Sequence, residues 1–161
     1  MPILQRLQDY LDEHKISHQL IRHQEAYTAS EIAHTLHISG KMLAKVVIIK
    51  SDERFVMAVL PSNQKVDFER LSDVLGGEHV RLATEWEFQE LFPDCGVGAM
   101  PPFGNLYGLE VFVDQSLTED EEIVFQAGNH LRVMKLRYQD FADLVHPKVT
   151  NFHLTAGFRG N

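Results

Sequence analysis

The spacing of hydrophobic residues predicts a helix at the start of the chain and strands soon after it. Between residues 3 and 13, apolar side chains recur three and four positions apart with polar ones between them, as in an amphipathic helix. Residues 18–23 predict a short strand. Residues 44–50 and 55–60 are largely apolar runs separated by the polar turn 51–54, so together they predict a β-hairpin.

Two polar segments mark the starts of helices. Residues 28–31 (Thr-Ala-Ser-Glu) and 84–87 (Thr-Glu-Trp-Glu) each place a threonine three positions before a glutamate. This is a capping box, in which the two side chains satisfy free amides of the first helical turn. We expect the apolar residues of the second helix to lie in the core, namely Trp86, Phe88 and Leu91.

The rest of the pattern alternates short strands with turns and two more helices. A helix is predicted to end at Gly76-Gly77, and a last helix covers residues 138–145. Further strands are predicted at residues 80–83, 109–113, 123–126 and 131–136. Because hairpins outnumber β-α-β units, the predicted fold class is α+β, with a curved, mixed, mostly antiparallel sheet around a pocket and helices packed outside. We expect one domain over residues 1–147 and a C-terminal extension over residues 148–161.

Composition and charge then limit the function. The chain has 161 residues, enough for one domain, and 15 basic against 23 acidic residues give a net charge of −8. Residues 82–131 contain no Lys or Arg, so the negative charge is concentrated there. This argues against nucleic-acid binding through a large positively charged surface.

The single cysteine, Cys95, excludes an internal disulfide. Since no apolar run or leader pattern is seen, we expect a cytoplasmic protein with no membrane and no DNA partner.

The segment 96–104 is the strongest candidate for chemistry. Gly98 can bring its amide close to a ligand without a side chain in the way, while Pro101 and Pro102 stiffen the loop. Such a loop suits the binding of a carbonyl oxygen or an oxyanion. The alternative is that it only connects a helix to a strand.

Two further residues are candidates for a polar pocket. Lys45 shares one face of a predicted strand with Val47 and Ile49, so it either protects a sheet edge or points into a pocket. His130 follows the turn Gly128-Asn129 and could act as a base, bind the substrate or be exposed.

Metal and thiol chemistry have little support in the sequence. The histidine pairs His14 with His18 and His34 with His37 have no third ligand in a recognisable pattern. Cys95 would need a neighbouring base to be a nucleophile, so an incidental thiol is the simpler interpretation. We therefore expect no metal and no cofactor.

Taken in order, five segments resemble one known family. They are residues 27–31 (Tyr-Thr-Ala-Ser-Glu), 43–48 (Leu-Ala-Lys-Val-Val-Ile), 57–61 (Met-Ala-Val-Leu-Pro), 98–104 (Gly-Ala-Met-Pro-Pro-Phe-Gly) and 126–130 (Gln-Ala-Gly-Asn-His). Over nearly the whole chain, this pattern resembles the YbaK family, also called the prolyl-tRNA synthetase-associated editing-domain family. The resemblance implies a curved mixed sheet and hydrolysis of the ester that joins a wrong, small amino acid to tRNA, typically Ala or Cys on proline tRNA.

The resemblance also implies roles for particular residues. Lys45, Gly98 and His130 would be catalytic. The substrate would be held by residues from three segments: Tyr27, Ala99, Met100, Pro101, Pro102 and Gly128. Pro101 stands where the cysteine-editing branch has a small polar residue, so cysteine specificity is not implied.

The expected partner is the acceptor end of an aminoacyl-tRNA, and a synthetase is a second candidate partner. Lys41, Lys45 and Lys50, or Arg132, Lys135 and Arg137, would supply a limited positive charge for that end. The alternative function is a non-catalytic module that binds tRNA ends or a synthetase. A third alternative is an enzyme that hydrolyses another small acyl ester.

Overall fold

The predicted hairpin lies at the centre of the structure. A computed structural model describes residues 3–23, 29–96 and 98–154. Strands β2 (Ala44–Ser51) and β3 (Arg54–Pro61) pair antiparallel along their whole length. The turn between them contains Asp52 with φ 53°, a left-handed conformation that Asp tolerates better than most residues.

The strands form two hydrogen-bonded sheets. The larger sheet has the order β4-β2-β3-β5-β8 and adds three strands to the hairpin: β4 (Val80–Leu82), β5 (Glu110–Asp114) and β8 (Lys148–Thr150). The smaller, antiparallel sheet has the order β1-β7-β6, with β1 (His18–Arg22), β7 (Arg132–Arg137) and β6 (Glu122–Gln126).

The mixed character of the sheets agrees with the predicted α+β class. In the larger sheet β5 pairs in parallel with both β3 and β8, while β2 pairs antiparallel with β3 and β4. A bridge between Leu43 and Val124 links the two sheets just before β2 begins. The one curved sheet expected from the sequence is therefore divided in two, because this link is a single bridge.

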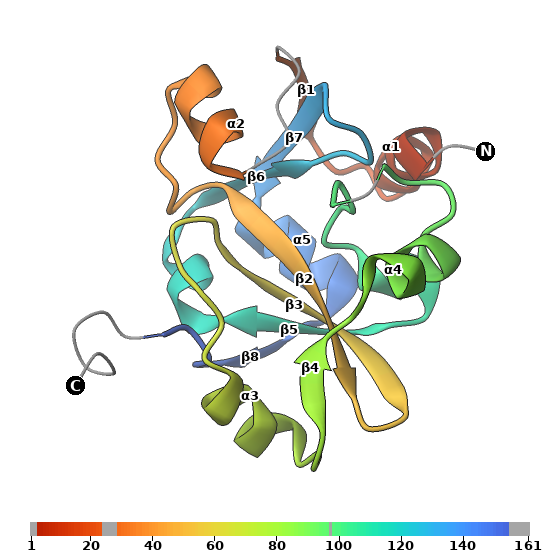
Figure 1. The fold of residues 1–161 in the computed structure, drawn as a ribbon. Helices are drawn as coiled ribbons and strands as arrows, with labels where there is room; N and C mark the ends of the chain where they lie inside the picture. The colour runs from red at the N-terminus through yellow and green to blue at the C-terminus, as the bar shows by residue number, and fades with distance from the viewer. Residues whose placement is uncertain (1–2, 24–28, 97, 155–161) are drawn as a thin grey trace.

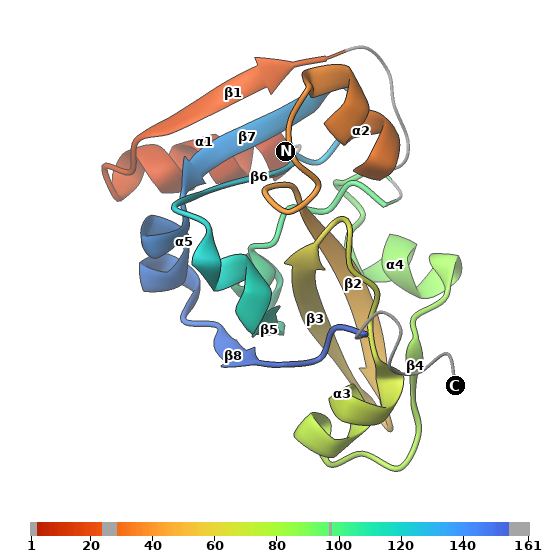
Figure 2. The same cartoon turned by 90° about the vertical axis from the view of Figure 1, so that its left-hand side faces the viewer.

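Helices lie outside the sheets. They are α1 (Ile3–Glu13), α2 (Ala29–Leu36), α3 (Phe68–Leu75), α4 (Glu85–Leu91) and α5 (Tyr138–Val145), with 3-10 turns η1 (Gly104–Tyr107) and η2 (Gln115–Glu119). Figure 1 and Figure 2 show the smaller sheet at one end of the molecule with α1 and α2 beside it, and α3 at the opposite end. None of the helices in the described part of the chain has the length and apolar character to span a membrane.

The two faces of β2 pack in different hydrophobic clusters, as its alternating pattern requires. Ala44 and Ile48 lie in the main core, which also holds the buried rings of Phe103, Phe125 and Phe141. Ile49 lies in a second cluster together with Leu71 of α3 and Phe152. Alternate side chains of β2 therefore pack on opposite faces of the sheet, each in a different cluster.

Two sequence expectations are changed by the fold. Trp86 is 69% exposed, so its assignment to the core is wrong, whereas the capping box of α4 at residues 84–87 is present. The segment after residue 147 begins as strand β8, and Phe152 is fully buried. The described part of the expected C-terminal extension is therefore built into the fold.

Candidate active site

The glycine-proline loop and the turn before β7 form one hydrogen-bonded unit. The amide of Gly96 donates to the carbonyl of Gly128 at 2.8 Å, and the amide of Gly128 donates to the carbonyl of Ala99 at 2.9 Å. The amide of Ala99 donates to Gly96 at 3.0 Å, which closes the loop on itself. Two segments that sequence analysis identified separately therefore meet in space.

Gly98 lies at the exposed tip of this loop. Its φ of 79° is in the region that favours glycine, and a Cβ built on it would meet no atom within 4 Å. The need for glycine is therefore set by backbone conformation and not by crowding. Among the described residues, no backbone carbonyl accepts from its amide.

The residues that follow Gly98 anchor the loop in the protein. Ala99 is fully buried and Met100 is 4% exposed, in the main core cluster. Pro101 and Pro102 are also buried. A rigid base of this kind holds the tip of the loop in one position, which a preorganised oxyanion site requires.

His130 is half-buried against the same loop. The side chain of Asn129 accepts hydrogen bonds from the amides of Leu131 and Arg132, both at 2.9 Å, and so fixes the turn. A Cβ built on Gly96 would lie 3.5 Å from the His130 ring, which shows that the ring packs over that glycine. The structure thus places His130 and the Gly98 loop in one site.

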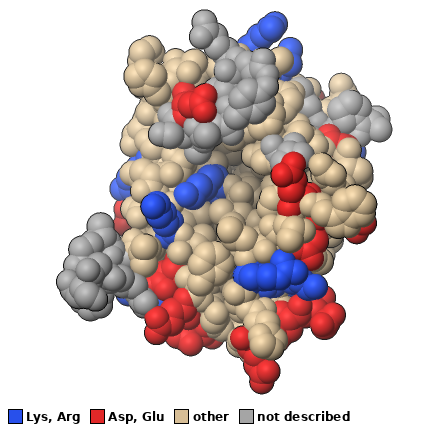
Figure 3. All heavy atoms as spheres, viewed as in Figure 1, with Lys and Arg blue, Asp and Glu red and all other residues tan. Residues whose placement is uncertain are grey.

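Lys45 is the second residue of β2 and lies opposite Leu60 of β3. It is half-buried, and burial lowers the pKa of its ammonium group, with a further contribution from the positive charge of Lys65. No carboxylate of the described residues forms an ion pair with it. Figure 3 shows Lys and Arg side chains gathered beside a hollow on the face where β2 lies.

Tyr27, also expected in the site, lies outside the described residues, as does Thr28 of the first capping box. Within the described residues, Lys45 forms no hydrogen bond with the Gly96–Gly128 unit.

A partly buried polar cluster lies at the start of the loop and was not recognised from the sequence. Arg6 of α1 donates to Asp94 at 2.7 Å, and the hydroxyl of Tyr107 donates to the other oxygen of Asp94 at 2.8 Å. Cys95 lies 3.2 Å from the same hydroxyl. Burial raises the pKa of the Cys95 thiol to about 12, so the thiol stays protonated at neutral pH. The single clue in the sequence was the position of Asp94 and Cys95 directly before Gly96.

The acidic segment is largely paired with cations from other parts of the chain. Glu119 lies 2.8 Å from Lys41, and Glu87 lies 3.9 Å from Lys50. Glu122 lies 3.9 Å from Lys135. The lysines expected to bind tRNA therefore differ in their ion pairs. Lys41, Lys50 and Lys135 already contact carboxylates, and Lys45 does not.

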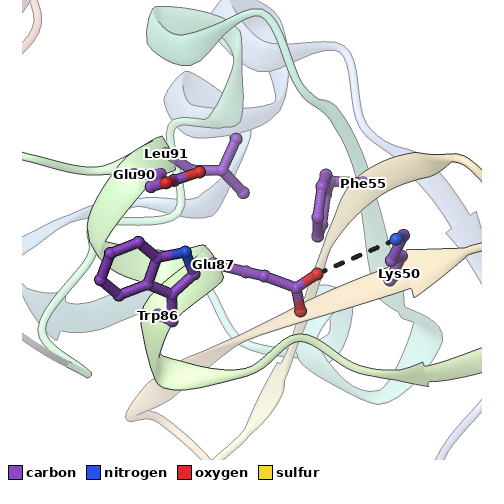
Figure 4. Close-up of a pocket in the computed structure, with 6 residues that line it drawn as sticks. All are labelled: Lys50, Phe55, Trp86, Glu87, Glu90 and Leu91. Atoms are coloured by element: carbon purple, nitrogen blue, oxygen red, sulfur yellow. Dashed lines mark ion pairs between the residues drawn. The ribbon is translucent and has the colours of Figure 1, made fainter.

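A separate open groove of about 480 Å³ lies between α4 and the hairpin. Figure 4 shows its lining, in which Lys50 faces Glu87 across the space near Phe55 and the ring of Trp86 lies on the α4 side. Glu87 also accepts from Arg81 and from the amide of Thr84, and these bonds hold its pKa at about 2. With a second glutamate, Glu90, on its wall, this groove is poorly suited to a phosphate.

Metal ligands do not come together in the part of the chain that the structure describes. No group of three or more His, Cys, Asp or Glu side chains lies in a metal-binding arrangement there.

Comparison with known proteins identifies the family of this chain. Residues 23–144 match the family described as "Aminoacyl-tRNA editing domain". The chain belongs to this family. The match includes Lys45, the Gly98 loop and His130, and it confirms the resemblance seen in the sequence.

Relatives of similar length carry related descriptions. The chain is 32% identical over 151 residues to the Multifunctional Ser/Thr-tRNA deacylase ProXp-y of Escherichia coli (strain K12), which covers 92% of this chain and 89% of the relative. It is 25% identical over 148 residues to the Prolyl-tRNA editing protein ProX of Acetoanaerobium sticklandii, covering 88% and 90%.

A solved structure supports the fold. A crystal structure described as a candidate trans-editing enzyme for prolyl tRNA synthetase superposes with a TM-score of 0.83 at 19% identity. The superposition covers 96% of this chain and 99% of that one. The α+β fold of the trans-editing enzymes is thus the fold of this editing domain.

Proposed function

We propose that this editing domain hydrolyses, in trans, the ester that joins a small, wrong amino acid to the 3′ end of a tRNA. The observation that carries the proposal is the unit formed by the Gly96–Ala99 loop and the turn before His130, with Gly98 at its exposed tip. An aminoacyl ester is already reactive, so the protein has to position water and stabilise the oxyanion that develops.

Each candidate residue has a distinct task in this mechanism. The amide of Gly98 donates to the carbonyl oxygen of the ester as negative charge develops on it. His130, fixed by the Asn129 turn, orients the attacking water or the amino group of the substrate. Lys45 binds the phosphate or ribose next to the ester and so holds the carbonyl in place. The amino acid itself is selected by the size of the pocket, which excludes larger residues.

We further propose that serine and threonine esters are hydrolysed in preference to alanine and cysteine esters. Support comes from the 32% identical relative, which is described as a Ser/Thr-tRNA deacylase. Support also comes from Pro101, which occupies the position of a small polar residue in the cysteine-editing branch.

A panel of mischarged tRNAs tests the proposal. Wild type and Lys45→Ala would be incubated with tRNAs carrying Ser, Thr, Ala, Cys and Pro, and the remaining ester would be measured over time. We expect the wild type to hydrolyse Ser and Thr esters faster than Ala and Cys esters, and Lys45→Ala to lose this activity with an unchanged circular dichroism spectrum. Faster hydrolysis of Ala or Cys esters would contradict the proposed preference. Binding without hydrolysis across the panel would instead support the non-catalytic module.

A further inference from the structure

Lys65 lies on a segment that is tied to the start of β2, close to Lys45. The amide of Ser62 donates to the carbonyl of Leu43 at 2.7 Å, and its hydroxyl donates to the carbonyl of Gly40 at 2.8 Å. On its other side, the carbonyl of Lys65 accepts from the amide of Leu154 at 2.7 Å. The segment 62–65 is therefore tied at its start to the residues before β2 and at its end to Leu154.

The charges of Lys45 and Lys65 act on each other. The positive charge of Lys65 contributes, after burial, to the lowered pKa of Lys45, so the two ammonium groups interact unfavourably. Two lysines close together, one of them half-buried, raise the free energy of the empty protein. The chain has 23 acidic residues that could have neutralised these two lysines, so the absence of an ion pair among the described residues needs an explanation.

Of the five other lysines, all but Lys15 form ion pairs within the described residues. Lys41, Lys50, Lys135 and Lys148 each lie within 4 Å of a carboxylate. Within the described ranges, neither Lys45 nor Lys65 has such a partner. These two lysines are therefore suited to a ligand that supplies the negative charge itself.

We propose that Lys45 and Lys65 together form a subsite for the phosphate group next to the terminal nucleoside of the tRNA. This inference rests on the proposed function, because that phosphate is the anion nearest to the ester. A phosphodiester between two ammonium groups relieves their repulsion and accepts a charge-assisted hydrogen bond from each. Lysine suits this task as a mobile point charge, whereas contacts to the base would require fixed geometry. Lys65 would therefore be a substrate-binding residue that adds to the role of Lys45.

The first experiment measures binding without any hydrolysis. Adenosine 5′-monophosphate and adenosine would be titrated into wild type, Lys65→Gln and Lys15→Gln, and amide shifts would be followed by NMR. Lys15 is a matched control, since it is also an exposed lysine that forms no ion pair within the described residues. We expect wild type and Lys15→Gln to prefer the nucleotide, and Lys65→Gln to lose most of that preference. Equal preference in all three proteins would overturn the subsite.

The second experiment measures catalysis on the esters that wild type hydrolyses. Loss of one charge-assisted contact should raise KM about ten-fold in Lys65→Gln and leave kcat nearly unchanged. The slope of log(kcat/KM) against log[salt] should become shallower by about 0.7–1. Lys65→Arg should restore most of the affinity. If wild type hydrolyses esters and Lys65→Gln has the same KM and salt slope, the subsite is wrong; if wild type hydrolyses none, the proposed function fails and the nucleotide titration alone decides the subsite.

Discussion

The amide of Gly96 donates a 2.8 Å hydrogen bond to the carbonyl of Gly128. This contact joins the loop that follows α4 to the turn that precedes β7, and the return bond from Gly128 to Ala99 makes the link reciprocal. As a result, the loop that carries Gly98 and the turn before His130 belong to one hydrogen-bonded unit, which is the candidate site. The predictions below test how this site works and what supports it.

Gly98→Ala tests whether the conformation of the loop tip serves catalysis. A Cβ at φ 79° strains the backbone by about 1–2 kcal/mol, so the loop should shift and deacylation should fall about ten-fold or more. Gly108→Ala is a matched control, since Gly108 has φ 72° and equally open surroundings. Both variants should lose similar stability in urea. An equal loss of activity in both would show that the Gly98 effect is not local.

Lys45→Met should make the protein more stable while abolishing deacylation. Burial, and then Lys65, lower the pKa of Lys45, so the folded protein binds its proton less tightly than the unfolded chain does. The resulting penalty is fully present below the lowered pKa and disappears as the pH rises to the ordinary value of 10.5. Thermal unfolding at pH 7 should therefore show a gain of about 0.5–1 kcal/mol that shrinks towards pH 10.5. A loss of stability at pH 7 would contradict this account.

Asp114→Asn should destabilise the fold in a pH-dependent way. Asp114 is fully buried; burial alone would raise its pKa, but bonds from the Ser116 hydroxyl and the Phe152 amide, and from His153, together lower it. Its contribution is present above the ordinary pKa of 3.8 and is lost as the pH falls through the lowered value. We expect a loss of about 1.5–3 kcal/mol in urea at pH 7. That loss should be smaller near pH 3, and Asp73→Asn on the exposed face of α3 should change little at either pH.

Cys95→Ala should keep deacylation within about two-fold of wild type, since a thiol with a pKa of about 12 supplies no nucleophile at neutral pH. For the same reason, Cys95 in the folded protein should react with iodoacetamide at pH 8 far more slowly than it does in urea. Rapid labelling of the folded protein, or loss of activity in Cys95→Ala with an unchanged Tm, would assign this thiol a part in the reaction.

Trp86→Ala should change the free energy of unfolding by less than about 0.5 kcal/mol, because this side chain is 69% exposed. Phe92→Ala at the end of α4 should lose about 3–5 kcal/mol, since Phe92 is 2% exposed. Trp86 is the single tryptophan, so the fluorescence of the native protein should report a water-exposed indole. A blue-shifted native spectrum would mean that Trp86 is covered in solution.

Local patterns in the sequence determined most of the secondary structure. The amphipathic period of residues 3–13, the apolar runs of the β2–β3 hairpin and the capping box of α4 each depend on neighbours within a few positions, and all three are present. Local patterns are less reliable for predicting which side chains of a short helix are buried. Helix α4 has seven residues, too few to define a clear apolar stripe, and Trp86 on it points to solvent.

The sequence also named Lys45, Gly98 and His130, but only the tertiary structure decided how they are supported. The bond between Gly96 and Gly128, the Arg6–Asp94–Tyr107 cluster and the place of Lys65 near β2 all join residues far apart in the chain. Such contacts depend on which strands pair and on which distant segments the fold brings together. One example is β8, which pairs with β5 and is followed by the buried Phe152. Periodicity and capping act over a few residues, so they set the elements, while packing between distant segments sets the site.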